Sequence, residues 1–362
     1  MDKSNKSGAE ALIHSLHLEG VDLMFGYPGG AALHIYDAIF NQNYVDHILV
    51  RHEQGAVHAA DGYARATGKP GVALVTSGPG ATNAITGLAT AYMDSTPIVV
   101  ISGQVKSNLI GTDSFQETDM IGVSRPIVKH SFLVQRAEDI PDIVKKAFHI
   151  ATTGRKGPVV IDIPKDFTDP EYKFEFNYPT EVNMRSYNPP QGADTSRIKE
   201  AADLIATAKR PVIYSGGGVN QNNASEELTA LAKLLNFPVT NTLMGLGAFP
   251  GSDPQFMGML GMHGTYQANM AMHNADLIIA VGARFDDRIT NDPKQFALSA
   301  KKIHIDVDPA SVSKIIHADI PIVGSAKESL TALIEELNSR DLKTNESDIS
   351  EWNEQIKNWR DA

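Results

Sequence analysis

The sequence contains no cysteine in its 362 residues. Disulfide bonds, thiolate catalysis and zinc–cysteine sites are therefore excluded, and a reducing cytoplasm is the expected location. Long hydrophobic runs are missing as well, since none approaches the roughly 20 residues that a membrane helix needs. Residues 1–10 are polar and lack the apolar core of a secretion signal. We therefore expect a cytoplasmic protein without a membrane segment.

The sequence has fewer basic than acidic residues. Lys and Arg number 32 against 43 Asp and Glu, so the formal net charge is −11 at pH 7. The sequence also has no Lys/Arg run, which argues against binding nucleic acid. The composition, 42% hydrophobic and 21% charged, is typical of a soluble protein. At this length two domains are expected.

Short apolar segments alternate with helical patterns through most of the chain. In the first half, strands are expected at residues 21–25, 47–50, 72–76, 98–102 and 159–163, and helices at 31–41, 53–67, 81–92 and 140–152. After residue 190, strands are expected at 212–215, 277–281 and 303–307, and helices at 197–207, 226–235 and 327–337. This alternation predicts an α/β fold with two doubly wound parallel-sheet domains.

Charges, tyrosines and prolines interrupt the alternation at residues 169–190, as expected of a linker. The predicted organisation is a first domain at 1–168, a linker at 169–190, a second domain at 191–340 and a tail at 341–362. In the tail, Trp352, Ile356 and Trp359 recur at helical spacing and form one apolar stripe. Two interpretations are open: the stripe packs on its own domain, or it leads toward a further domain.

Polar or glycine-rich turns follow the strands predicted in the first domain. Gly26–Gly30 (GYPGG) and Thr76–Gly80 (TSGPG) could each bring backbone N–H groups close to a ligand at a helix start. Alternatively, such tight turns need glycine for conformational reasons alone. In a later polar loop, Phe115 and Gln116 could face a pocket or be exposed to solvent.

Glu53 is a candidate for proton transfer. It lies just after a predicted strand, in the first turn of a helix rich in Gly and Ala. Small side chains let another backbone come close, so a carboxyl group at this junction would be poorly solvated and suited to acid–base chemistry. The alternative is a helix cap that favours the helix dipole.

Glycine and charge also gather after the strands predicted in the second domain. Gly216–Gly218 could let a phosphate-bearing ligand approach the backbone, but it lacks the GxGxxG pattern of classical NAD binding. The other segments of this kind are Leu260–Gly264, Gly282–Arg288 and Ile303–Pro309. Arg284 and Arg288 could bind a diphosphate. The alternative for both is surface ion pairing with the neighbouring aspartates.

Taken together and in this order, the motifs resemble those of acetolactate synthase (acetohydroxyacid synthase) large subunits, a family of thiamine-diphosphate enzymes. The resemblance runs from about Gly8 to the last helical segment. It implies a pyrimidine-binding domain followed by a central, FAD-binding, Rossmann-like domain. It also implies that Glu53 hydrogen-bonds the aminopyrimidine ring of thiamine diphosphate and takes part in removing the thiazolium C2 proton.

The same resemblance implies further site residues. The implied catalytic residues are Gly30, Glu53, Gln116 and Lys165, and the implied substrate channel contains Pro97, Phe115 and Lys165. The implied FAD contacts are Arg155, Gly216, Gly217, Gly218, Thr242, Leu243, His263, Gly282, Ala283, Arg284, Asp286, Arg288, Asp306, Val307 and Ser325.

Two features depart from the family pattern. Ser325 stands where relatives commonly carry Asp, which leaves that flavin contact open. The family also holds Mg²⁺ and the diphosphate with a Gly-Asp-Gly motif and an Asn ligand, and no Gly-Asp-Gly occurs in these 362 residues. We therefore expect no metal ligands here, a missing C-terminal diphosphate-binding domain, and no activity of the chain alone.

The implied reaction is carboligation in branched-chain amino-acid biosynthesis. Two pyruvates give 2-acetolactate and CO₂, or pyruvate and 2-ketobutyrate give 2-aceto-2-hydroxybutyrate. Thiamine diphosphate, Mg²⁺ and a structural FAD are the implied cofactors. A homodimer or higher oligomer and a small regulatory subunit are the implied assemblies. The alternatives are a pyruvate oxidase-like flavoenzyme, a flavin-free acetolactate synthase, and a non-catalytic or truncated scaffold that pairs with a separate diphosphate-binding chain.

Overall fold

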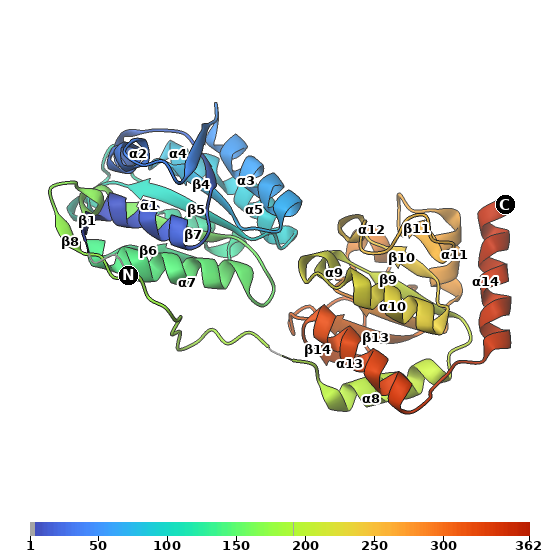
Figure 1. The fold of residues 1–362 in the computed structure, drawn as a ribbon. Helices are drawn as coiled ribbons and strands as arrows, with labels where there is room; N and C mark the ends of the chain where they lie inside the picture. The colour runs from blue at the N-terminus through green and yellow to red at the C-terminus, as the bar shows by residue number, and fades with distance from the viewer. Residues whose placement is uncertain (1–3, 191) are drawn as a thin grey trace. The chain divides into compact units, whose positions relative to one another are not determined.

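A computed structural model of the chain describes residues 4–190 and 192–362. Residues 1–3 and 191, which fall in the predicted ranges 1–168 and 191–340, lie outside the described residues. The chain divides into two compact units, Met1–Asn188 (unit 1) and Pro189–Ala362 (unit 2). Each unit contains a parallel sheet between layers of helices (Figure 1), which confirms the predicted fold class.

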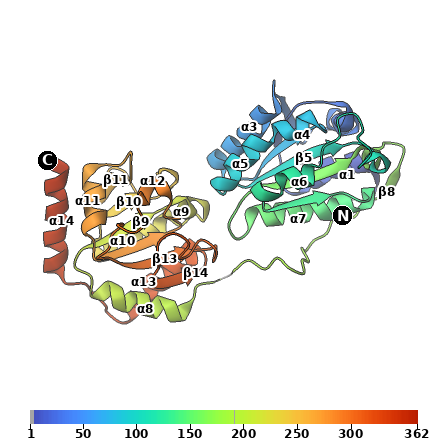
Figure 2. The same ribbon diagram turned by 180° about the vertical axis from the view of Figure 1, so that it is seen from behind.

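Unit 1 is built on a six-stranded parallel sheet with the order β3-β2-β4-β5-β7-β6. Its strands are β2 (Leu23–Gly26), β3 (Asp46–Leu49), β4 (Gly71–Val75), β5 (Ile98–Gln104), β6 (His130–Leu133) and β7 (Val159–Pro164). Its helices are α1 (Gly8–Leu18), α2 (Leu33–Phe40), α3 (Glu53–Thr67), α4 (Pro79–Asn83), α5 (Ile85–Met93), α6 (Met120–Ser124) and α7 (Ile140–Thr152). Helices α1, α2 and α7 pack on one face of the sheet, while α3, α5 and α6 pack on the other (Figure 1 and Figure 2).

Helix α3 shows how local sequence produces these elements. Its buried alanines recur at i, i+4 and i+8, from Ala56 to Ala64, so one face packs on the sheet. His52 caps the start by accepting a hydrogen bond from Gln54 N at 3.1 Å. Gly68 ends the helix with a left-handed φ of 74°. The helix predicted at residues 53–67 is thereby confirmed.

Unit 2 repeats the architecture with the strand order β11-β10-β9-β12-β13-β14. Its strands are β9 (Pro211–Ser215), β10 (Val239–Asn241), β11 (Phe256–Met259), β12 (Leu277–Val281), β13 (Lys301–Asp306) and β14 (Ile320–Val323). Its helices are α8 (Thr195–Ala206), α9 (Gly217–Gln221), α10 (Ser225–Leu235), α11 (Tyr266–Asn274), α12 (Asp287–Thr290), α13 (Ala326–Ser339) and α14 (Glu346–Asp361). Helices α8, α10 and α13 cover one face, and α11 and α14 the other.

The segment predicted as a linker, residues 169–190, is attached to unit 1 along most of its length. Within it, β8 (Lys173–Glu175) pairs antiparallel with β1 (Asn5–Ser7). The Tyr178 hydroxyl donates to Glu19 Oε1 at 2.6 Å. The Tyr187 hydroxyl donates to the Thr153 carbonyl at 2.8 Å. The polar and aromatic residues that suggested an irregular linker therefore anchor this strap to its own sheet unit.

The tryptophan stripe of the tail packs on unit 2. Trp352 and Ile356 are each only 4% exposed. Trp359 meets Trp352 edge to face with ring centroids 5.7 Å apart. The indole Nε1 of Trp352 donates to the carbonyl of Pro211 at 3.0 Å. The first interpretation, that the stripe packs on its own domain, is confirmed. The stripe is therefore mostly buried.

We expect Trp352→Phe to destabilise unit 2 by about 1–2 kcal/mol, because Phe keeps most of the apolar contact but leaves the buried Pro211 carbonyl without its donor. Urea unfolding followed by circular dichroism measures the change. Trp359→Phe, on the same stripe but partly exposed, is the matched control. An unchanged midpoint for Trp352→Phe would show that α14 contributes little to the unit.

Candidate functional site

Each sheet has a switch point, a pair of neighbouring strands from which the connecting segments lead to opposite sides of the sheet. In unit 1, β3 and β4 flank β2 on its two sides. In unit 2, β10 and β12 flank β9 in the same way. Open α/β sheets bind ligands outside the carboxyl ends of the strands at such a switch point. The predicted glycine-rich turns follow the strands that meet at these two positions.

Glu53 lies at the switch point of unit 1, at the first position of α3, and is only 9% exposed. Its Oε2 accepts a hydrogen bond from Asn83 Nδ2 at 2.9 Å. A Cβ added to Gly80 would stand 3.3 Å from Glu53 Oε1. The carboxylate is therefore enclosed between the start of α3 and the turn after β4, as the small residues around it suggested. Asn83 was not identified from the sequence as its partner.

Tyr36 lies close enough to Glu53 to be affected by its negative charge, and Tyr36 in turn pairs with His47. The Tyr36 hydroxyl lies 3.2 Å from His47 Nε2. Burial first, and the negative charge of Glu53 second, raise the pKa of Tyr36. Burial lowers the pKa of His47. Both groups are therefore neutral at pH 7. Neither residue belongs to a recognisable motif, so sequence reasoning missed them.

The two glycine-rich turns of unit 1 meet. The backbone N–H of Ala31 donates to Thr76 Oγ1 at 3.2 Å. A Cβ added to Gly30 would meet nothing within 4 Å, so this part of the turn borders open space. Gln116 lies against the second turn, with its carbonyl oxygen 2.6 Å from where a Cβ on Gly78 would stand. The structure thus brings the turns of Gly30, Glu53 and Gln116 to one edge of the sheet.

The other residues predicted for this site are divided between the two edges of the sheet. Lys165 follows β7 at the same edge as Glu53, and Phe115 is 88% exposed in the loop beside Gln116. Pro97, in contrast, precedes β5, and its carbonyl accepts from Gly71 N at the start of β4 at 3.1 Å. Within unit 1, the fold therefore does not bring Pro97 to the edge that carries Glu53, because parallel strands place their amino ends opposite.

Arg155 also lies at the amino-terminal edge of the unit 1 sheet, in the turn before β7. Its Nε donates to Ser95 Oγ at 2.8 Å. The other predicted flavin contacts all belong to unit 2.

The switch point of unit 2 is a contact between two backbones. The N–H of Gly218 donates to the carbonyl of Gly282 at 3.1 Å. Gly282 has a φ of +57°, and a Cβ there would stand 2.6 Å from the Gly218 Cα. Only glycine fits both the left-handed conformation and the close approach. The result is a side-chain-free cradle between β9 and β12, suited to a diphosphate.

The remaining predicted flavin residues lie at the carboxyl ends of the unit 2 strands. Thr242 and Leu243 follow β10, His263 follows β11, Ala283 and Arg284 follow β12, Asp306 and Val307 stand at the end of β13, and Ser325 follows β14. Leu243 is 66% exposed at this edge. The predicted set in unit 2 therefore shares one edge of one sheet.

The two arginines of this edge differ. Arg288 Nε donates to Asp287 Oδ2 at 3.1 Å, and Asp286 accepts from the Arg288 N–H at 3.0 Å as the cap of α12. The ion-pairing alternative is thus observed for Arg288. Arg284 makes no ion pair within residues 4–190 and 192–362 and is partly exposed. It is the better candidate for an anionic ligand.

His304 lies under the loop that follows β12 and holds it by a hydrogen bond to Ala283. It was not among the predicted site residues. It is 1% exposed, and its Nε2 donates to the Ala283 carbonyl at 2.8 Å. Burial lowers the pKa of His304, so the ring is neutral at pH 7 with its hydrogen on Nε2. A single buried polar residue in a strand carries no sequence signal that would distinguish it from an ordinary core position.

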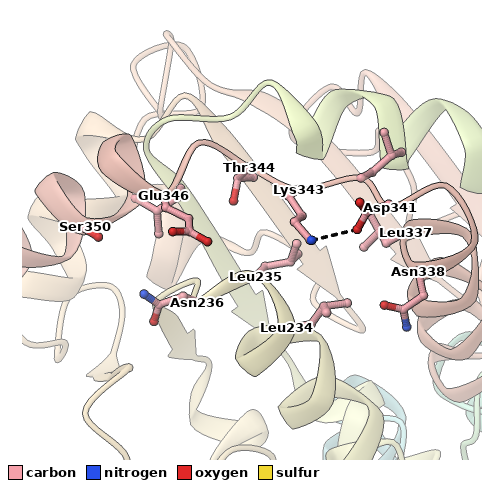
Figure 3. A pocket seen from close by; sticks show the side chains of 12 residues that line it. Leu234, Leu235, Asn236, Leu337, Asn338, Asp341, Lys343, Thr344, Glu346 and Ser350 are labelled. Atoms are coloured by element: carbon pink, nitrogen blue, oxygen red, sulfur yellow. Dashed lines mark ion pairs between the residues drawn. The ribbon is translucent and has the colours of Figure 1, made fainter.

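A cavity of about 350 Å³ opens elsewhere in unit 2 (Figure 3). It lies between the ends of α10 and α13 and the segment that leads into α14, with leucine side chains in its wall. Lys343 and Asp341 form an ion pair of 2.9 Å beside it. Helices α10 and α13 end at the amino-terminal edge of the sheet, so this cavity is separate from the candidate cofactor site. No predicted site residue lines it.

Two further properties concern the described parts of the chain. None of their helices is long and apolar enough to cross a membrane. No group of three or more His, Cys, Asp or Glu side chains in them could hold a metal ion.

The sequence matches two family descriptions, one in each unit. Residues 6–123 match "Thiamine pyrophosphate enzyme, N-terminal TPP binding domain". Residues 198–333 match "Thiamine pyrophosphate enzyme, central domain". The first match contains Glu53 and both glycine-rich turns of unit 1. The second contains the switch point of unit 2.

Curated relatives agree over nearly the whole chain. The acetolactate synthase large subunit of Haemophilus influenzae is 57% identical over 98% of this chain and 62% of its own length. The isozyme 3 large subunit of Escherichia coli is 56% identical over the same shares. A probable acetolactate synthase large subunit of Methanocaldococcus jannaschii is 52% identical over 96% of this chain and 58% of its own length. The chain thus spans about 58–62% of these relatives. It belongs to the acetolactate synthase large-subunit family of thiamine pyrophosphate enzymes.

Proposed function

We propose that this chain supplies the proton-transfer part and the flavin-holding part of an enzyme that makes 2-acetolactate from pyruvate. The observation that carries the proposal is the enclosed carboxylate of Glu53 at the switch point of a sheet whose family binds thiamine pyrophosphate. The relatives named as acetolactate synthases favour this reaction over the pyruvate oxidase alternative.

The residues of unit 1 fit the aminopyrimidine end of the cofactor. Glu53 supplies a carboxylate with Oε2 held by Asn83, and Gly30 leaves open space at the same edge. Glu53 would hold a proton and return it, while the turns position the ring and exclude water. Thiamine diphosphate, when bound, supplies the electron sink for decarboxylation. Acetolactate synthesis then needs a second pyruvate as acceptor, or 2-ketobutyrate for the homologous product.

The residues of unit 2 fit FAD. The Gly216–Gly218 and Gly282 backbones meet so closely that a Cβ on Gly216, Gly218 or Gly282 would collide with the facing strand end, so backbone groups line this edge. Arg284, which makes no ion pair among the described residues, follows β12 at the same edge. Asp306, 9% exposed at the end of β13, suits ribose hydroxyls. Carboligation has no net redox change, so the flavin would have a structural role.

Mg²⁺ and the assembly complete the proposal. Mg²⁺ would neutralise the diphosphate, through ligands that the resemblance assigns to a diphosphate-binding domain. The relatives are named large subunits, which supports a small regulatory subunit as a partner. A homodimer or higher oligomer is proposed as well.

We expect the 362-residue chain to bind FAD and Arg284→Ala to weaken binding about 10- to 100-fold, the usual effect of losing a charge-assisted hydrogen bond. Titration followed by flavin fluorescence measures the affinity. Arg197→Ala removes an exposed arginine that pairs with Glu200 on α8 and is the control. Absent binding would favour a flavin-free enzyme, whereas FAD binding with equal affinity in the Arg284 variant would contradict the role given to Arg284.

A further inference from the structure

Asp162 is a buried carboxylic acid that the proposed chemistry does not use. It stands in β7, is 1% exposed, and its Oδ1 has no hydrogen-bond partner in the described parts of the chain. Its Oδ2 accepts from Gln104 Nε2 at 3.0 Å. An incompletely hydrogen-bonded acid at a core position of a parallel sheet costs stability, which points to a role other than stabilising the fold.

Gln104 connects this acid to the loop that follows β5. Its Nε2 also donates to the carbonyl of Thr118 at 2.7 Å, and its Oε1 accepts from Val105 N at 2.8 Å. The side-chain amide therefore holds both ends of the segment 105–118. Asp162 helps to orient that amide, because its Oδ2 accepts the second N–H of Nε2 and so holds the amide nitrogen toward the Thr118 carbonyl.

The segment held in this way is strained and faces the active-site edge. Asp113 and Gln116 have positive φ values of 59° and 61°. Glu117 closes the loop by accepting from the backbone N–H of Ser114 at 3.1 Å and of Gly111. Residues with side chains keep left-handed conformations only where their surroundings enforce them. Here one enforcing contact is the Gly78 turn against Gln116, next to Glu53.

We propose that Asp162 and Gln104 are positioning residues that lock the loop 105–118 and so place Gln116 against the turn beside Glu53. The catalytic meaning of Gln116 rests on the proposed function. The locking itself is a property of this chain and can be measured without activity. Asp162 acts through Gln104, and neither side chain needs to touch substrate or cofactor.

Hydrogen exchange of the 362-residue chain, read by mass spectrometry, tests the proposal. Gln104→Met keeps the length of the side chain without its donors, and Asp162→Leu keeps its bulk without an acceptor. Both are expected to raise exchange of residues 105–118 about tenfold or more while β4 and β5 stay protected. Asp162→Asn retains an acceptor oxygen and is expected to restore exchange to within about twofold of the wild type.

Gln255→Met is the matched control. Gln255 Nε2 donates to two backbone carbonyls of unit 2, Ala232 and Phe237, each at 2.8 Å. Its loss removes a similar pair of bonds and is expected to leave residues 105–118 unchanged. Unaltered exchange in Gln104→Met and Asp162→Leu would overturn the proposal. So would a rise that extends equally to β4 and β5, or an Asp162→Asn variant as fast as Asp162→Leu.

A second experiment tests whether the position of the loop 105–118 affects the rate of the reaction. In an enzyme completed by a diphosphate-binding domain, Gln104→Met is expected to lower kcat about tenfold and Asp162→Asn to stay near the wild type. Normal kcat in Gln104→Met despite rapid exchange would overturn the placement of Gln116. If the completed wild-type enzyme makes no acetolactate, the proposed function fails, whereas the exchange experiment still decides the locking.

Discussion

Glu53→Gln is expected to lower carboligation about 10²–10⁴-fold, the usual contribution of a general acid–base group, in an enzyme that contains this chain and a diphosphate-binding domain. Gln preserves the size of the side chain and can still hydrogen-bond an aminopyrimidine ring. It cannot hold and return a proton. Exchange of the C2 proton of thiamine diphosphate, followed by NMR, measures the affected step directly.

The competing interpretation treats Glu53 as a helix residue that only favours the dipole of α3. In that case Glu53→Gln would lower stability by about 1 kcal/mol or less and leave the exchange rate intact. His52→Ala separates the two effects, because it removes the side chain that caps α3 and leaves the carboxylate. We expect a lower melting temperature and near-normal C2 exchange for His52→Ala. The same pattern in Glu53→Gln would contradict its catalytic assignment.

Asp162→Asn is expected to remove the loss of unit 1 stability that the ionisation of Asp162 causes between pH 4 and pH 8. Burial is the main cause that raises the pKa of Asp162 from 3.8 to about 7, against the opposing hydrogen bond from Gln104. The folded state therefore keeps a proton that the unfolded chain releases above pH 4. The stability that Asp162 contributes is full below that pH, falls as the pH rises toward 7, and is lost above it.

The size of this effect follows from the shift. At about 1.4 kcal/mol for each pKa unit, the ionisation of Asp162 by itself costs the wild type on the order of 4 kcal/mol between pH 4 and pH 8. Asn cannot ionise, so the variant should be more stable than the wild type at pH 8. Urea unfolding at a series of pH values measures both curves. Asp46→Asn, an exposed acid on β3, is the control with a wild-type slope. Parallel curves for the wild type and Asp162→Asn would contradict the raised pKa.

The sequence predicted the elements whose signals are local. Helices α3 and α7 and strand β12 have the predicted bounds, because each is a long periodic or continuous apolar segment between clear punctuation. The predicted helix 81–92 instead divides into α4 and α5. Strand β10, only three residues with two buried polar side chains, carries no such signal. Sheet partners supply its stability, so a linear pattern cannot reveal it.

The residues of the candidate site likewise fall into those that local sequence reveals and those that it does not. Glu53 and the glycine turns could be located because a strand end followed by a helix start is visible in sequence. Asn83, Tyr36 and His304 could not, since their meaning comes from which strands are neighbours. Pro97 was assigned from the family resemblance alone, and the fold places it at the start of β5, on the opposite edge of the unit 1 sheet from Glu53.

The central claim is tested most directly by acetolactate formation from pyruvate, measured without oxygen and with thiamine diphosphate, Mg²⁺ and FAD present. One sample is the 362-residue chain alone, and the other is the same chain fused after Ala362 to the diphosphate-binding domain of a relative. The chain alone should give no product, because a metal clamp supplies most of the charge neutralisation that a diphosphate needs. The fusion should give acetolactate and CO₂ in equal amounts. Turnover by the mass-verified chain alone, a fusion that binds thiamine diphosphate without making acetolactate, or a requirement for an oxidant would contradict the account.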